Sequence, residues 1–104
     1  MSFYQKLGEA VTTPGIYPEV STEEFPGDVL HYALHLTGAS AVECTCALQE
    51  QVFDGGWVTT HDVRMTGQLE ESAAFDTRLG TGRVRLVVTS ITGELNTQVT
   101  GGAR

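Results

Sequence analysis

The chain has 104 residues, of which 40% are hydrophobic and only 18% charged. That length allows a single domain with one core. Thirteen acidic residues against six basic ones give a net charge of −7, and because phosphate backbones repel an acidic surface, we expect no nucleic-acid partner.

No apolar run approaches the roughly 20 residues that a membrane helix needs, so we expect no membrane partner. Residues 1–6 (MSFYQK) lack the basic and apolar regions of a signal peptide. We therefore expect the protein to be assembled in the cytoplasm of the cell that makes it.

Residues 1–28 are predicted to form an extended N-terminal arm. They contain all three prolines of the chain and show no sustained periodicity, and proline removes a backbone donor that a central strand needs. The arm is too apolar for a free linker, so we expect it to pack against this domain or a neighbour. Its large apolar residues are Phe3, Tyr4, Ile16, Tyr17 and Phe25.

Residues 29–104 are predicted to form an antiparallel β-sandwich of the jelly-roll or immunoglobulin-like type. Apolar residues alternate over 29–37, 42–49, 57–65, 83–91 and 95–100, with glycine-containing turns between these segments. Residues 68–76 fit a strand or a helical turn, and their context favours a strand. Six or seven strands at this spacing are typical of such folds.

The alternation also predicts which side chains share a face. Three runs should each present one apolar face: Leu30, Tyr32, Leu34 and Leu36; Val42, Cys44, Cys46 and Leu48; and Val84, Leu86 and Val88. In the segment 57–65, Trp57, Thr59, His61 and Val63 are expected on one side.

Cys44 and Cys46 are expected to be free, buried thiols. On a strand, their Cα atoms lie about 6.5–7 Å apart, at or beyond the reach of an undistorted disulfide. A zinc half-site needs a wider loop and a second pair of ligands, so we expect no metal here.

No constellation predicts catalysis or cofactor binding. His31 and His35 share a metal only on a helix, because on a strand they lie about 13 Å apart, and the alternation favours a strand. His61 has no sequence neighbour that pairs with it, and no Gly-x-Ser-x-Gly nucleophile turn occurs. We therefore expect a protein that is not an enzyme and has no cofactor.

Two features are candidates for interactions. Trp57 follows a Gly-Gly turn, where it either caps the core or stacks on a sugar. Arg78, Arg83 and Arg85 are the only basic cluster; they either contact an acidic partner, including a second copy of this chain, or pair with acidic residues on adjacent strands.

Residues 54–60 (DGGWVTT), 82–93 (GRVRLVVTSITG) and 99–102 (VTGG) resemble small β-sandwich structural proteins of tailed bacteriophages. The resemblance implies a virion protein, most simply a capsid decoration or cement protein that binds the major capsid protein or other virion subunits. A neck, tail or fibre accessory protein is the close alternative. A carbohydrate-binding module that uses Trp57 is the alternative from another class. The expected interaction residues are the five apolar arm residues and the three arginines.

Overall fold

The structure, a computed structural model, describes residues 2–21, 29–51, 55–78 and 83–102, with the backbone alone at 2–5, 18–21, 29, 77–78 and 101–102. These residues form eight strands: β1 (Ser2–Val11), β2 (Gly15–Ser21), β3 (Val29–Thr37), β4 (Val42–Gln51), β5 (Trp57–Gly67), β6 (Glu70–Arg78), β7 (Arg83–Thr92) and β8 (Glu94–Gly102). The predicted all-β fold is confirmed.

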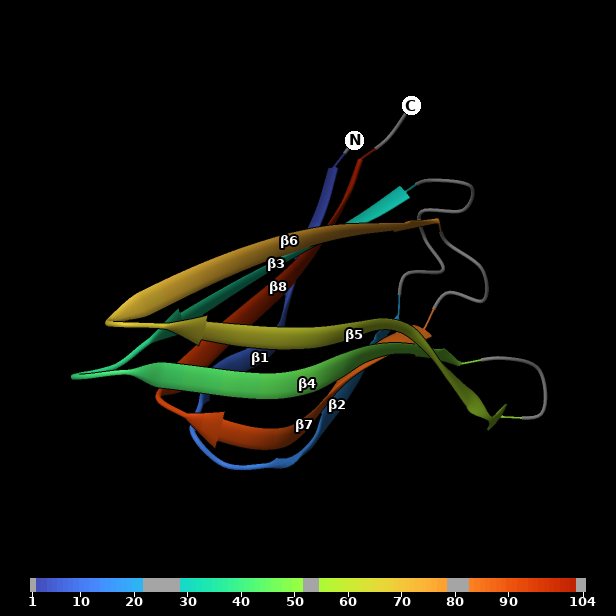
Figure 1. Cartoon of the computed structure of the whole chain (residues 1–104). Coiled ribbons are helices and arrows are strands. Elements are labelled where there is room, and N and C mark those ends of the chain that lie inside the picture. The colour runs from blue at the N-terminus through green and yellow to red at the C-terminus, as the bar shows by residue number, and fades with distance from the viewer. Residues whose placement is uncertain (1, 22–28, 52–54, 79–82, 103–104) are drawn as a thin grey trace.

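The strands form two antiparallel sheets that pack face to face (Figure 1). Sheet A has the order β1-β8-β3-β6, and sheet B has the order β2-β7-β4-β5. The chain crosses between the sheets at every connection except the hairpin from β4 to β5. This order, with first and last strands adjacent in one sheet, is that of an eight-stranded jelly roll.

The predicted arm is wrong for residues 2–11 and 15–21, which are strands of the sandwich itself. β1 pairs with β8 and β2 pairs with β7. Pro18 is tolerated because β2 is an edge strand and the residue lies at its register shift, between Tyr17 and Val20. Pro18 therefore lies within an edge strand, and with β1 and β2 the described residues form eight strands rather than six or seven.

The core lies between the two sheets, and its buried residues come from β1, β3, β4, β5, β7 and β8. The predicted inward faces of β3, β4 and β7 are confirmed. The buried apolar residues are Leu7, Val11, Leu30, Tyr32, Leu34, Leu36, Val42, Cys44, Cys46, Leu48, Val63, Met65, Val84, Leu86, Val88, Leu95 and Val99. Because Leu7 and Val11 belong to this cluster, β1 is part of the core and not an appendage.

The predicted face of β5 is only half right. Leu48 pairs with His61, and the next residue, Gln49, pairs with Thr59, so Thr60 is an extra residue in the strand. A bulge of this kind reverses the alternation. His61 and Val63 therefore face the core, whereas Trp57 and Thr59 face outward.

Cys44 and Cys46 are free and buried on the inner face of β4, as predicted. The hydrogen bond between the two thiols, together with burial, raises the pKa of the Cys46 thiol. A thiol with a raised pKa is a poor nucleophile, which agrees with a packing role for Cys46.

Candidate functional site

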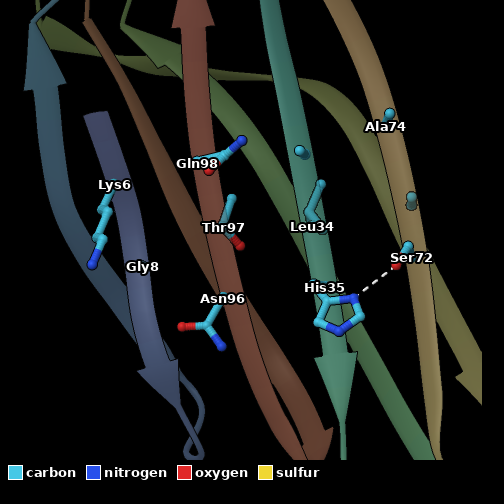
Figure 2. Close-up of a pocket in the computed structure, with 11 residues that line it drawn as sticks. Lys6, Gly8, Leu34, His35, Ser72, Ala74, Asn96, Thr97 and Gln98 are labelled. Carbon is cyan, nitrogen blue, oxygen red and sulfur yellow. Dashed lines mark hydrogen bonds between the residues drawn. The ribbon is translucent and has the colours of Figure 1, made fainter. Parts of the chain in front are cut away.

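A groove with a volume of about 480 Å³ crosses the outer face of sheet A, and all four strands of that sheet line it (Figure 2). Its exposed lining consists of Lys6, Ala33, His35, Ser72, Ala74 and Asn96, with Gln98 half-buried beside them. Buried Leu34 and Thr97 lie beneath it. We call this feature the sheet A groove.

Small side chains form the floor of the groove because two alanines face each other across adjacent strands. Ala33 on β3 is paired with Ala74 on β6, and on its other side with Gln98 on β8. Gln98 is in turn paired with Lys6 on β1. Ala33 and Ala74 therefore form a depression in this cross-strand row, because an alanine side chain extends only one carbon atom from the sheet.

A bulge in β1 extends the groove to the edge of the sheet. Lys6 is paired with Gln98 and Gly8 with Thr97, which leaves Leu7 as an extra residue. Leu7 points into the core, and so would a Cβ atom on Gly8, which would lie 3.1 Å from Leu86 Cδ2 and 3.2 Å from Val11 Cγ2. Two successive residues thus turn no side chain outward, and the outer face of β1 is bare at this point.

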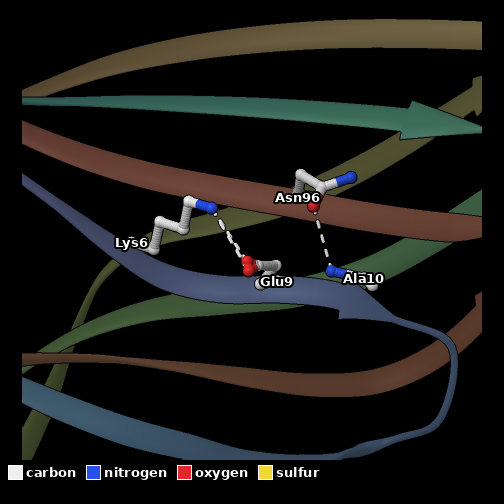
Figure 3. A network of polar contacts seen from close by, with 4 residues as sticks. All are labelled: Lys6, Glu9, Ala10 and Asn96. Carbon is white, nitrogen blue, oxygen red and sulfur yellow. Dashed lines mark hydrogen bonds and ion pairs between the residues drawn. The ribbon is translucent and has the colours of Figure 1, made fainter.

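Side chains on either side of this bare segment hold it in place (Figure 3). The Lys6 Nζ atom lies 2.8 Å from Glu9 Oε1, so the ion pair spans the bulge. Ala10 has a φ of 51°, a left-handed conformation that disfavours residues with a Cβ atom. Its backbone N–H donates to Asn96 Oδ1 at 2.9 Å, which satisfies a donor that the sheet ladder does not use.

Two histidines of β3 stand on opposite sides of the alanine floor, and each contacts the neighbouring strand β6. His35 Nδ1 lies 2.8 Å from Ser72 Oγ, and His31 Nδ1 contacts Asp76 Oδ1. Each pair joins residues that are directly opposite in the ladder. The two histidines are therefore oriented by β6 and not by each other.

Ser72, His35 and Glu70 are arranged in the order of a nucleophile, a base and an orienting acid. However, the distance from His35 Nε2 to Glu70 Oε2 is 3.9 Å, and the two side chains are 48% and 70% exposed. A catalytic histidine needs to donate a short hydrogen bond to its acid, which fixes the ring and its tautomer. What the geometry does offer is a set of hydrogen-bonding side chains around an apolar floor.

Of the predicted apolar interaction residues, Ile16 is 63% exposed on β2. It is paired with Val87 on β7, which is paired with Ala47 on β4, and both of these are half-buried. The three side chains form an apolar strip on the outer face of sheet B. Tyr17 instead packs against the core, and its hydroxyl donates to the Thr13 carbonyl oxygen.

Of the three arginines in the predicted cluster, Arg83 and Arg85 lie on β7 of sheet B, whereas Arg78 lies on β6 of sheet A. Arg83 is exposed at the start of β7. Arg85 Nε donates to Gln49 Oε1 at 2.9 Å, and its guanidinium carbon lies 4.2 Å from the centre of the Trp57 ring. One face of Trp57 is thus occupied by Arg85 on the outside of sheet B, which corrects the alternative in which Trp57 caps the core.

The remaining predicted interaction residues are described incompletely. Phe3 and Tyr4 lie in β1, opposite Gly101 and Thr100, and Arg78 lies in β6, opposite Val29. The side chains of all three are outside the described part of the structure, and Phe25 is outside the described residues.

Two general findings concern the described residues only. Within residues 2–21, 29–51, 55–78 and 83–102, no three His, Cys, Asp or Glu side chains are grouped so that they could hold a metal ion. The same part of the chain contains no helix with the length and apolarity to cross a membrane.

Sequence analysis did not find the sheet A groove. The signal is present in the exposed alanines and in the histidines on either side of Ala33, but the strand register decides which residues are neighbours. Ala33 and Ala74 are 41 positions apart and meet only because β3 pairs with β6. An excess of small residues at outward positions of a predicted strand is the pattern that would indicate such a groove.

No protein-family model matches the chain, and no curated protein matches it in sequence. Among solved structures, the chain is similar to the SPBc2 prophage-derived protein YomS, with a TM-score of 0.60 and 15% identity over 97% of this chain and 92% of YomS. It also aligns with the Yersinia pseudotuberculosis-derived mitogen, with a TM-score of 0.44 and 14% identity over 100% of this chain and 85% of the mitogen. The likeness to YomS establishes a shared fold.

Proposed function

We propose that the chain is a non-enzymatic structural protein of a tailed-bacteriophage particle, and that it decorates the capsid by binding across its subunits. The observation that carries the proposal is the jelly-roll fold. This fold is similar to that of the prophage-derived protein YomS over 97% of this chain. The resemblance of residues 54–60 and 82–93 to small phage structural proteins supports the same role.

The apolar strip Ile16–Val87–Ala47 is the surface that we assign to the capsid contact. An exposed isoleucine beside two half-buried apolar residues is suited to burial against another protein. A protein that binds the assembled lattice and not the free subunit stabilises the shell by mass action. That effect requires binding and no chemical step.

Binding to particles that lack the protein tests this role. We expect the purified chain to pellet with such capsids and to saturate at a fixed number of copies per shell. Ile16→Asp should abolish pelleting, because it places a charge in the contact. Leu69→Asp is the matched control, since Leu69 is 60% exposed at the turn between β5 and β6, and it should bind normally.

Failure to pellet with capsids would refute the decoration role. Binding to isolated necks, tails or fibres would instead assign the protein to that part of the virion. Equal binding by Ile16→Asp and Leu69→Asp would show that the contact lies on another face.

A further inference from the structure

We propose that the sheet A groove is a binding site for a short, neutral oligosaccharide. This inference concerns a different face from the apolar strip and does not depend on the capsid role. It follows from the shape of the groove, from the hydrogen-bonding chemistry of its walls and from its charge balance.

The shape of the groove suits a short chain of rings lying across the strands. Its volume of about 480 Å³ falls within the range of about 300–1,000 Å³ that is usual for small-molecule sites. Four strands at about 4.8 Å spacing give it a length of about 14 Å. The apolar methyl groups of Ala33 and Ala74 form a flat floor on which the non-polar face of a sugar ring can lie.

The walls carry groups that can both donate and accept hydrogen bonds. Asn96 and Gln98 are amides, His35 is an imidazole, and Ser72 is a hydroxyl. Sugar hydroxyls likewise donate and accept hydrogen bonds, so these side chains can act as donors or as acceptors toward them.

Charge favours a neutral ligand. Lys6 lies beside Glu9, so the lysine at the groove has an acidic neighbour. The whole chain has a net charge of −7, which repels acidic saccharides.

The position of the groove disfavours a peptide strand as its occupant. A peptide that adds a strand to a sheet forms hydrogen bonds with the backbone groups of an exposed edge strand. The central strands beneath the groove, β8 and β3, are each hydrogen-bonded to a strand on both sides. Recognition in the groove must therefore come from side chains.

Titration of the isotope-labelled full chain with neutral trisaccharides, followed by backbone amide NMR, tests the site. The probes are maltotriose, cellotriose, mannotriose and chitotriose, with trigalacturonic acid as the acidic counterpart. We expect saturable shifts at Ala33, Ala74 and Gln98 with at least one neutral probe, and none with the acidic one.

Two variants locate the binding. Ala33→Leu fills the floor, and His35→Phe keeps a ring but removes its hydrogen bonds; each should weaken binding about tenfold or more. Thr66→Leu, at an exposed position of β5 in sheet B, adds the same side chain elsewhere and should leave affinity unchanged.

The inference is overturned if none of the four neutral probes binds, or if only trigalacturonic acid does. It is equally overturned if binding persists in both groove variants, or if the shifts gather around Trp57 and Arg85 on the other sheet. Because no capsid takes part, these outcomes are independent of the pelleting experiment.

Discussion

At the scale of single residues, the core contains two hydroxyl groups without a hydrogen-bond partner in the described structure. Tyr32 Oη and Thr97 Oγ1 are both buried, and both belong to sheet A. Burying a polar group without a partner costs about 1–3 kcal/mol. We therefore expect substitutions that remove either hydroxyl, and keep the rest of the side chain, to raise the free energy of unfolding.

Tyr32 gives a direct test of this cost. Tyr32→Phe removes the hydroxyl and keeps the ring, whose centre lies 6.3 Å from that of His61. We expect the free energy of unfolding to rise by about 1 kcal/mol, measured by urea denaturation. Tyr17→Phe is the control, because it removes a hydroxyl that donates to Thr13 and should not stabilise the protein. A Tyr32→Phe variant no more stable than the parent would show that the hydroxyl has a partner.

The same residue predicts a dependence on alkaline pH. Burial, and to a lesser degree the charge of Glu50, raise the pKa of Tyr32. Above pH 10 or so, the unfolded tyrosine loses its proton while the folded one keeps it, so the unfolded state binds fewer protons and stability falls as pH rises. The stability advantage of Tyr32→Phe should therefore widen above that pH, and an advantage that stays constant would contradict the raised pKa.

At the scale of elements, β1 is the most irregular strand. It has two register shifts against β8, one between Lys6 and Gly8 and one between Gly8 and Val11. Irregular edge strands are poor templates for pairing with other chains. The same irregularity clears the outer face of the strand, so protection of the edge and formation of the groove have one structural origin.

Ala10 reports on the strain in this strand. With a φ of 51°, Ala10→Gly should raise the free energy of unfolding by about 0.5–1 kcal/mol, because glycine adopts this conformation without steric conflict. Ala39→Gly is the control: Ala39 is exposed in the turn after β3 and is not in a left-handed conformation. That change should destabilise by a similar amount through the entropy of the unfolded chain. Thermal melts of both variants give the comparison, and a destabilised Ala10→Gly would contradict the strain.

At the scale of the whole molecule, we expect the fold to require its first two strands, because both belong to the sheets. Removing residues 1–24 deletes Leu7 and Val11 from the core and exposes the paired edges of β8 and β7. We expect the truncated chain to be unfolded, with a collapsed amide NMR spectrum. The single change Leu7→Ala should leave a folded protein that is about 2–4 kcal/mol less stable. A well-dispersed spectrum from the truncated chain would show that the predicted arm is separable after all.

Sequence reasoning predicted the sandwich because inward faces follow directly from alternation. β3 and β4 keep a strict period of two, and β7 keeps it as far as Val88, so their buried residues match the prediction. The prediction was wrong where the period is broken. Pro18 at the edge of a sheet looks the same in sequence as proline in a linker, and the bulge at Thr60 cannot be seen until Leu48 and Gln49 are paired with β5.

The candidate sites show the same limit. Ile16 was singled out because it is one of five large apolar residues in a segment that contains the prolines. The sheet A groove could not, because its floor and walls come from four strands whose neighbours are set by the sheet order. Likewise, Arg85 was grouped with Arg78 and Arg83 by sequence distance, whereas its contacts are Gln49 and Trp57 from two other strands.

The pairing of β1 with β8 also has a consequence for how the molecule folds. Ser2 faces Gly102 across this pair, and β2 likewise has to find β7. During synthesis, β2 has no partner strand until β7 has left the ribosome, and β1 has none until β8 has. Contacts this distant in sequence make folding slow, and unpaired strand edges expose a growing chain to aggregation. Expression at low temperature or with chaperones should therefore affect the yield of this protein more than its final stability.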